Sequence, residues 1–180
     1  MQKWRFPLEK LIDREIKNAK NGKPAGIIIK LNNLQEKNMV EKLYEASRAG
    51  VKVQLVIRSI CTLAPGIEGQ SENITVHRII DRYLEHARVF VFQNNGEPLY
   101  FMGSADWMNR NLHSRIEVVF PVNDTVLCKE LNHILTLQLG DNTKAVWLKN
   151  TLENQRIPVP GGKPSIAAQE AIYNYVKGLS

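Results

Sequence analysis

Cysteine is scarce in this sequence: Cys61 and Cys128 are the two present, and they lie far apart. A disulfide-stabilised domain needs more cysteines, and this spacing matches no metal-binding motif. No apolar run reaches the roughly 18 residues of a membrane-spanning helix, and the first residues lack the apolar core of a secretory signal. We therefore expect a cytoplasmic protein without a membrane span, leaving open peripheral contact at the inner membrane face.

Low-complexity tracts and internal repeats are also missing, so the chain has the composition of an ordinary folded domain. It has 180 residues, and 43% of them are hydrophobic, enough for a packed core. The net charge of +6 favours an anionic partner such as phosphate, nucleotide, nucleic acid or an anionic membrane. The sequence starts almost directly on a predicted helix, so we expect it to be a piece of a longer protein.

Hydrophobic periodicity predicts an α/β fold. The first third alternates helix and buried strand, the pattern of a parallel crossover, over residues 8–19, 25–29, 35–49 and 51–57. After a loop over 62–73, four short strands are predicted at 74–80, 87–92, 99–103 and 116–122. Asn95-Gly96 predicts a tight turn, and Asp124 caps a helix that runs to Leu139, with Leu127 among its inward residues.

Composition changes near residue 150, which suggests a boundary. Residues 157–165 hold three prolines and two glycines, and 167–179 predict a small terminal helix. We therefore expect a domain over 1–150, with a mixed β-sheet flanked by helices, followed by a Pro/Gly-rich linker and terminal helix over 151–180.

His86 and Arg88 stand two apart at the start of the strand predicted at 87–92. Side chains two apart on a strand share a face, so an imidazole and a guanidinium are expected to face one pocket. Imidazole acts as nucleophile or general acid and base near neutral pH, and guanidinium holds phosphate oxygens in pairs. The simpler alternative is a pair at the strand edge facing water.

A second polar cluster follows the strand at 99–103. Gly103-Ser104 allows close approach of an anion to the backbone, and Arg110 adds positive charge nearby. The same residues also fit a simple turn and helix cap. His77 and His133 are expected to be structural, as is His113, although it lies nearer the predicted site. Trp107 is expected to anchor the turn by packing.

Taken together, a histidine, a basic residue two later, and Gly-Ser after a hairpin resemble the half-site of the phospholipase D superfamily. Two departures stand out. Arg88 replaces the lysine of the superfamily's His-x-Lys motif, and Gln93 stands where an acidic residue is expected. Both changes disfavour a phospholipase or a nuclease.

A more specific resemblance comes from the stretch after the strand at 51–57. Arg58-Ser59-Ile60-Cys61, then Leu63-x-Pro65-Gly66, is similar to the signature of the polyphosphate kinase C-terminal domain, with Ser59 in place of glycine. Further segments resemble the same family in the same order between about Leu11 and Leu139, among them Asp81-Arg82-Tyr83-Leu84-Glu85-His86 and Ser104-Ala105-Asp106-Trp107-Met108-x-Arg110-Asn111.

The resemblance implies a phospholipase D-like domain of an enzyme that moves the terminal phosphate of ATP reversibly onto polyphosphate through a phosphohistidine. That histidine belongs to a preceding domain with a His-x-Lys motif, and none of the four histidines here is followed by lysine two residues later. Magnesium is expected to bind mainly in that domain, and no metal ligand is assigned in this chain. Expected partners are ATP, polyphosphate, the remaining domains and a second copy of the protein, but no nucleic acid.

Carried over by position, Arg58 and His86 are expected to contact the nucleotide phosphates, with His86 as the catalytic donor to the leaving oxygen. Arg88, Ser104 and Arg110 are further candidates for lining the same site. Two other functions stay open at this point. One is a single-motif nuclease or phosphodiesterase that pairs two copies of His86 in a dimer, and the other is a non-enzymatic module that binds polyanions.

Overall fold

The computed structural model describes residues 5–157 and 164–179. Its helices are α1 (Arg5–Lys20), α2 (Lys37–Arg48), α3 (Asn109–His113), α4 (Thr125–Leu139) and α5 (Ala168–Lys177), with a 3-10 turn η1 (Asn94–Gly96). Its strands are β1 (Gly26–Leu31), β2 (Lys52–Ile57), β3 (Ile74–Arg78), β4 (Val89–Phe92), β5 (Leu99–Gly103), β6 (Val119–Val122), β7 (Val146–Leu148) and β8 (Asn154–Arg156).

Within the described residues, eight strands form one mixed sheet in the order β6-β5-β4-β1-β2-β3-β7-β8. The central strands β1, β2 and β3 are parallel, as the predicted crossover requires, and every other pairing is antiparallel. The predicted α/β fold with a mixed sheet flanked by helices is confirmed.

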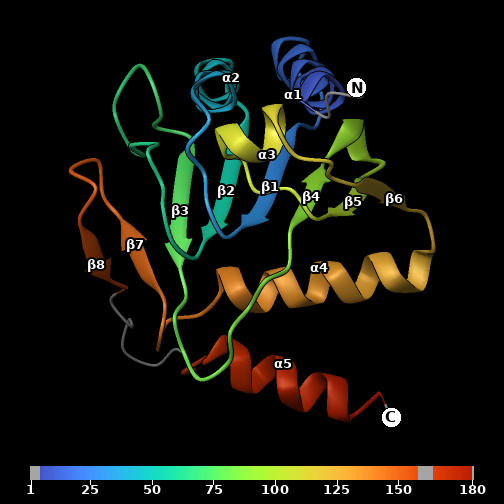
Figure 1. The fold of residues 1–180 in the computed structure, drawn as a ribbon, viewed down its shortest axis with the longest axis vertical. Helices are drawn as coiled ribbons and strands as arrows, with labels where there is room; N and C mark the ends of the chain where they lie inside the picture. Colours follow the sequence, from blue (N-terminus) through green and yellow to red (C-terminus); the bar gives the residue numbers. More distant parts are fainter. Residues whose placement is uncertain (1–4, 158–163, 180) are drawn as a thin grey trace.

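Side-chain alternation along β1 divides the core into two layers. Ile27 and Ile29 belong to the main core together with residues of α1 and α2, whereas Ile28 packs in a second cluster with Leu135 of α4. Figure 1 shows the result: α1 and α2 lie on one side of the sheet, α4 lies on the other, and α5 lies outside α4. The first and last described helices, α1 and α5, therefore lie on opposite sides of the molecule.

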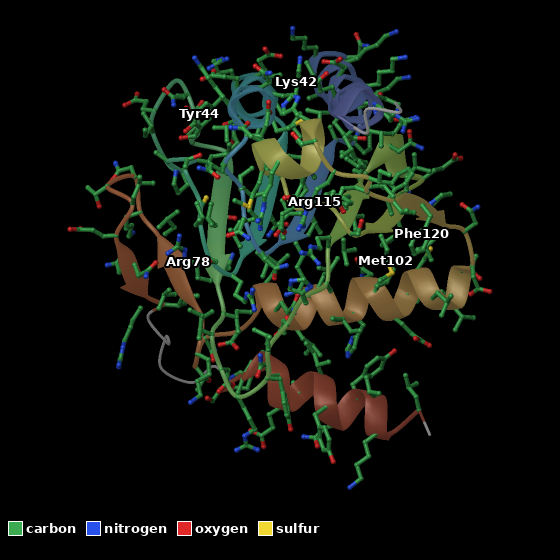
Figure 2. All side chains as sticks on the ribbon, in the orientation of Figure 1. Lys42, Tyr44, Arg78, Met102, Arg115 and Phe120 are labelled. Carbon is green, nitrogen blue, oxygen red and sulfur yellow. The ribbon has the colours of Figure 1, made fainter. Side chains whose placement is uncertain are left out.

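The predicted inward face of α2 is confirmed, since Val40, Leu43, Tyr44 and Ser47 are all buried. Its outward face is charged: Lys42 (Figure 2) lies 3.1 Å from Oδ1 of Asp13 on α1 and 2.6 Å from Oε2 of Glu45. On the opposite side of the sheet, the side chain of Met102 on β5 lies toward α4 (Figure 2) and packs in the second cluster.

Helix α4 begins as predicted, because the carboxylate of Asp124 accepts hydrogen bonds from the amides of Val126 and Leu127. The prediction for Leu127 is wrong, since half of this residue is exposed. The residues of α4 that pack on the sheet include Cys128, Leu131 and Leu135, so Leu127 lies beside that stripe instead of on it.

The segment after Leu148 continues the sheet and then covers it. Strand β8 pairs antiparallel with β7, and α5 packs against α4, with Ala168 fully buried beside Val56 and Ile79. The centre of the predicted Pro/Gly-rich linker, 158–163, lies outside the described residues. The boundary at residue 150 stays a prediction.

Candidate functional site at one edge of the sheet

Segments that carry all the predicted site residues meet at one edge of the sheet. Strands β1 and β2 end there, β4 begins there and β5 ends there, as the pairs Leu31–Ile57, Lys30–Val89 and Val89–Met102 show. In an open α/β sheet, the carboxyl ends of the parallel strands are the usual place for ligand binding.

Residues 32–34, which continue β1, form the centre of this edge. The amide of Ser59 donates to the carbonyl oxygen of Asn32 at 2.8 Å, and the amide of Leu34 donates to Ile60 at 2.8 Å. On the other side, the amide of Trp107 donates to the carbonyl oxygen of Asn33 at 3.2 Å. The segments carrying Arg58 and Ser104 therefore flank the same short stretch.

His86 and Arg88 lie just before β4, because the strand begins at Val89, two residues later than predicted. Their side chains contact each other: Nη1 of Arg88 lies 2.8 Å from Nδ1 of His86 and donates to the His86 carbonyl oxygen at 2.9 Å. That both face one pocket stays a prediction. An imidazole nitrogen that accepts a hydrogen bond carries no proton. The Nε2 of His86 also lies 3.3 Å from Nη2 of Arg88, so both ring nitrogens face the guanidinium, and the one without a proton can accept from it.

The guanidinium of Arg88 is also paired with Asp106. Its Nε lies 3.2 Å from Oδ1 of Asp106, and Nη2 donates to Oδ2 at 3.3 Å. The same carboxylate accepts hydrogen bonds from the backbone amides of Asn32, at 2.9 Å, and Asn33, at 3.3 Å. Arg88 therefore has a fixed structural partner, and less of its charge is available to a phosphate.

The electrostatics of Asp106 follow from these contacts. Burial alone raises the pKa of its carboxyl group, but hydrogen bonds from the Asn33 side chain, Arg88 and the Asn32 amide, together with the charge of Arg88, outweigh that effect. The pKa of Asp106 therefore lies below its ordinary value of 3.8. Asp106 is ionised near neutral pH and holds Arg88 in place.

Arg58 directly follows β2 and is half-buried. Its backbone amide donates to the carbonyl oxygen of Leu31 at 3.2 Å, which fixes the position of its Cα. Among residues 5–157 and 164–179, none accepts a hydrogen bond from the Arg58 guanidinium and none forms a salt bridge with it. The contrast with Arg88 is clear, because Arg58 keeps its charge available to an anion.

Asn32 connects the Arg58 segment with the His86 segment. With its amide oxygen toward Arg88, it accepts hydrogen bonds from Nε and Nη2 of that residue at 3.2 and 3.1 Å. Its nitrogen then donates to the carbonyl oxygen of Glu85 at 3.0 Å. Asn32 thus bonds through its backbone to Ser59, next to Arg58, and through its side chain to Glu85 and Arg88, which flank His86. Among the described residues, no hydrogen bond joins the side chains of Arg58 and His86.

Gly103 and Ser104 have structural partners of their own. A Cβ on Gly103 would lie 2.7 Å from the carbonyl oxygen of Val118, so glycine is required for β6 to approach β5. The hydroxyl of Ser104 donates to Glu117 and accepts from the amide of Val118 at 3.1 Å. Arg110 is exposed on α3.

The remaining histidines have local structural contacts, as predicted. The Nε2 of His77 accepts from the indole of Trp147 at 3.0 Å, and His133 packs on the ring of Tyr175. The Nε2 of His113 lies 3.1 Å from a carboxylate oxygen of Glu36. Trp107 is fully buried and stacks on Phe90, with ring centroids 5.9 Å apart, which confirms its packing role.

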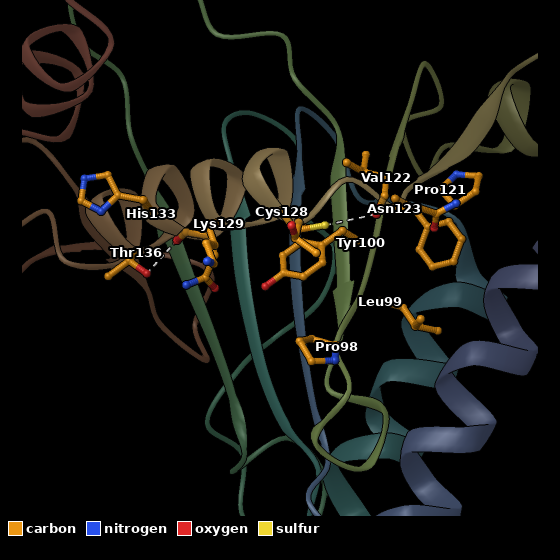
Figure 3. A pocket seen from close by; sticks show the side chains of 13 residues that line it. Pro98, Leu99, Tyr100, Pro121, Val122, Asn123, Cys128, Lys129, His133 and Thr136 are labelled. Carbon is orange, nitrogen blue, oxygen red and sulfur yellow. Dashed lines mark hydrogen bonds between the residues drawn. The ribbon is translucent and has the colours of Figure 1, made fainter. Parts of the chain in front are cut away.

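The two largest of the cavities lined by α4 differ in whether they include a predicted site residue. The larger, of about 740 Å³, is an open groove between α4, β5 and β6 that includes Tyr100, Cys128 and His133 (Figure 3). None of the described residues that line it is a predicted site residue. The other, of about 490 Å³, lies between β1, α4 and α5, and His86 forms part of its wall.

Side chains that could bind a metal ion do not cluster in the described part of this chain. Those residues contain no group of three or more histidine, cysteine, aspartate or glutamate side chains arranged to hold a metal ion. We assign no metal ligands here. Likewise, no helix among the described residues is long and apolar enough to cross a membrane.

Comparison with known proteins identifies the family. The model of the family described as polyphosphate kinase C-terminal domain 2 matches residues 2–169. The chain belongs to this family. It is 47% identical over 175 residues to the polyphosphate kinase of Vibrio vulnificus strain YJ016, covering 97% of this chain and 25% of that protein. Against the Escherichia coli K12 polyphosphate kinase, identity is 44% over 178 residues, covering 99% of this chain and 26% of that protein.

Solved structures agree with this family assignment. The crystal structure of polyphosphate kinase from Porphyromonas gingivalis aligns with a TM-score of 0.91 at 46% identity, covering 94% of this chain and 26% of that one. The chain therefore spans about a quarter of the length of its relatives.

More distant structures confirm the predicted phospholipase D-like fold. NucT from Helicobacter pylori aligns with a TM-score of 0.52 at 13% identity, covering 72% of this chain and 87% of that one. The phospholipase D family member Nuc from Salmonella typhimurium aligns with a TM-score of 0.50 at 15% identity, covering 68% and 83%. At these identities the likeness concerns the fold alone.

Several residues that shape this edge had no role predicted from the sequence. Asn32 and Asp106 organise it, and Lys30 pairs with Glu85 beneath it. One signal was available in advance, because a lysine inside an apolar strand needs a buried partner. The partner itself lies 55 positions along the chain and has no sequence signature.

Proposed function

We propose that this chain is one half of the phosphoryl-transfer site of a polyphosphate kinase that moves the terminal phosphate of ATP reversibly onto polyphosphate. The observation that supports this best is that Asn32 bonds through its backbone to the segment of Arg58 and through its side chain to the segment of His86, at one sheet edge. Membership of the family over residues 2–169 gives the reaction class. The phosphorylated histidine belongs to a domain outside this chain.

The proposed roles follow from the contacts of each side chain. Arg58 has no described partner, so its guanidinium is the group available to neutralise phosphate oxygens, where charge accumulates in the transition state. The imidazole of His86, whose Nδ1 and Nε2 lie 2.8 and 3.3 Å from nitrogens of Arg88, supplies the proton for the leaving oxygen. Arg88 orients that ring, and Ser104 and Arg110 are more distant contributors to the same edge.

The surroundings of this half-site are also proposals. ATP and polyphosphate are the substrates, the other protein domains complete the site, and Mg²⁺ is held mainly by the preceding domain. The full-length enzyme is a homo-oligomer and is cytoplasmic, with contact at the inner membrane face left open. The proposal includes no nucleic-acid partner.

The half-site proposal is tested by comparing the isolated chain with the longer protein that contains it. The isolated chain should bind ATP or polyphosphate weakly and show almost no turnover, whereas the longer protein should be active. Robust ATP-dependent polyphosphate synthesis by the isolated chain would show that the site is complete here and would contradict the proposal.

The residue roles are tested by substitution in the longer protein. His86→Ala should lower kcat by about 10²–10⁴-fold, the contribution of a general acid, and Arg58→Ala by about 10²–10³-fold, that of a charge-stabilising group. His133→Ala and Arg48→Ala are matched controls, because His133 is exposed on α4 and Arg48 is exposed in the last turn of α2, before β2 begins. Normal kcat in both Arg58→Ala and His86→Ala would overturn the assignment.

The nuclease alternative makes a separate prediction. Cleavage of DNA or of a generic phosphodiester by the isolated chain, abolished by His86→Ala, would favour it. The geometry disfavours that outcome, because the position of the superfamily lysine is held by Arg88, which is committed to Asp106. Salt-sensitive polyanion binding that survives both substitutions would instead favour the non-enzymatic module.

A further inference from the structure

Glu85, which immediately precedes His86, has a carboxylate held from three directions. One oxygen, Oε2, accepts from Nζ of Lys30 at 2.5 Å and from Nε2 of Gln138 at 2.5 Å. The other, Oε1, accepts from Nε2 of Gln169 at 3.0 Å. These donors belong to β1, α4 and α5, which are distant in sequence. The carboxylate is therefore the point where three elements are joined to the His86 segment.

This polar group lies in apolar surroundings. The cavity that Lys30, Glu85 and His86 share is also lined by residues of α4 and α5 such as Leu131, Leu135 and Ile172. The Lys30 side chain is 8% exposed and that of Glu85 is 20% exposed. Burying such a pair costs desolvation energy, and a well-packed apolar pair is often equally stable. Stability alone therefore gives little reason for an ion pair at this place.

The same contacts replace the backbone hydrogen bonds that the segment lacks. Residues 79–88 form no helix or strand. Gln169 binds the backbone of Tyr83 in both directions, accepting from its amide at 2.7 Å and donating to its carbonyl oxygen at 2.8 Å. Asn32 holds the carbonyl oxygen of Glu85 at 3.0 Å. The position of His86 is thus set by side chains of other elements.

We propose that Glu85 and Gln169 are positioning residues for His86, and that α5 is thereby a working part of the phosphoryl-transfer site. This rests on the proposed function. Gln169 and Gln138 hold the Glu85 carboxylate, the carboxylate fixes the chain before His86, and Arg88 fixes the ring from the other side. Loss of these contacts displaces the imidazole of His86 and leaves the position of Arg58 unchanged.

The test measures steady-state kinetics of the longer protein carrying Gln169→Ala or Glu85→Gln. Because small displacements of a catalytic group are costly, kcat should fall about 10–100-fold, whereas KM for ATP should change by less than about twofold because Arg58 is intact. Glu170→Gln is the matched control, since Glu170 is the exposed neighbour on α5. Unchanged kcat in both test variants would overturn the proposal.

A second variant separates positioning from stability. The triple substitution Lys30→Met, Glu85→Leu and Gln138→Leu replaces the ion pair and the buried glutamine that donates to it with apolar side chains, while Gln169 keeps its bond to Tyr83. No buried amide then loses its acceptor, so the melting temperature should stay near that of the unsubstituted protein. The proposal predicts that kcat still falls about 10–100-fold. A triple variant with full kcat would show that these contacts serve folding alone and would overturn the proposal.

A third measurement distinguishes this inference from the proposed function. In a His86→Ala background, Gln169→Ala should cause almost no further loss, because both act through the same imidazole. If His86→Ala is harmless, the proposed function itself fails. If His86→Ala is damaging and Gln169→Ala lowers activity equally with and without His86, the proposed function stands and the positioning role of Gln169 fails.

Discussion

Arg88 and Asp106 form an ion pair of 3.2 Å that joins the segment before β4 to the segment after β5. The same carboxylate holds the backbone amides of Asn32 and Asn33 after β1. Three segments at the proposed site are thus fixed through one acidic residue. The proposed substrate-binding charge of Arg58 lies outside this network, which leaves it available.

Asp106→Asn should destabilise the chain strongly. The substitution keeps the shape but removes the charge, so the buried guanidinium of Arg88 loses its partner, at a cost of about 3–5 kcal/mol. The control is Asp13→Asn, because Asp13 is exposed and its pair with Lys42 should contribute at most about 1 kcal/mol. Urea unfolding near neutral pH measures both. Equal small losses would show that the Asp106 network contributes little.

The contribution of Asp106 should depend on pH in a defined direction. Its pKa is lower in the folded protein than its ordinary value of 3.8, so the unfolded chain binds the proton more readily as the solution is acidified. The stabilisation is therefore present above 3.8 and is lost as the pH falls through the folded value. The difference in unfolding free energy between the unsubstituted chain and Asp106→Asn should shrink in acid. A difference that is constant with pH would contradict this.

His77 should make stability fall at mildly acidic pH. Burial lowers its pKa below 6.5, although the charge of Asp141 opposes this effect, so protonation favours the unfolded chain. Its stabilising contribution is complete above 6.5 and is lost as the pH falls through the folded value. His77→Gln should weaken the dependence of the urea midpoint on pH in this range, whereas His133→Gln, at an exposed position, should not. Identical pH dependence in the unsubstituted chain and His77→Gln would contradict the assignment.

Trp107→Ala should cost about 3–5 kcal/mol, as large-to-small changes of buried aromatic residues do. Trp107 has no exposed surface and stacks on Phe90, and its carbonyl oxygen accepts from the amides of Gln35 and Glu36. Trp107→Phe should cost less, because an aromatic ring remains against Phe90. Calorimetric unfolding measures both variants. A larger loss for phenylalanine than for alanine would contradict a packing role.

Local patterns predicted the framework of this domain well. The alternation of apolar segments predicted the parallel centre of the sheet, and cap residues such as Asp124 predicted where helices begin. The short strands β7 and β8 were harder to predict, because three residues are too few to show a periodicity. Strand β1 extends two residues beyond the end predicted at residue 29. A lysine after an apolar run indicates a strand end, but Lys30 stays in the strand because it is paired with Glu85.

The candidate site was predicted in part. The spacing of His86 and Arg88 predicted that both face one pocket. The structure shows a contact between them, and long-range contacts such as the Arg88–Asp106 pair hold them in position. No local rule predicts that Gln169, in what looked like an appendage, binds the backbone of Tyr83. Side-chain contacts of this kind depend on tertiary packing, so they become visible only in the folded chain.

The most direct test of the central claim is a double-substitution cycle on Arg58 and His86 in the longer protein. If both side chains act on one transferring phosphate, the loss of kcat/KM in the double variant should be clearly smaller than the product of the two single losses. Losses that multiply fully, or single variants that keep normal kcat/KM, would contradict a shared phosphate at this edge of the sheet.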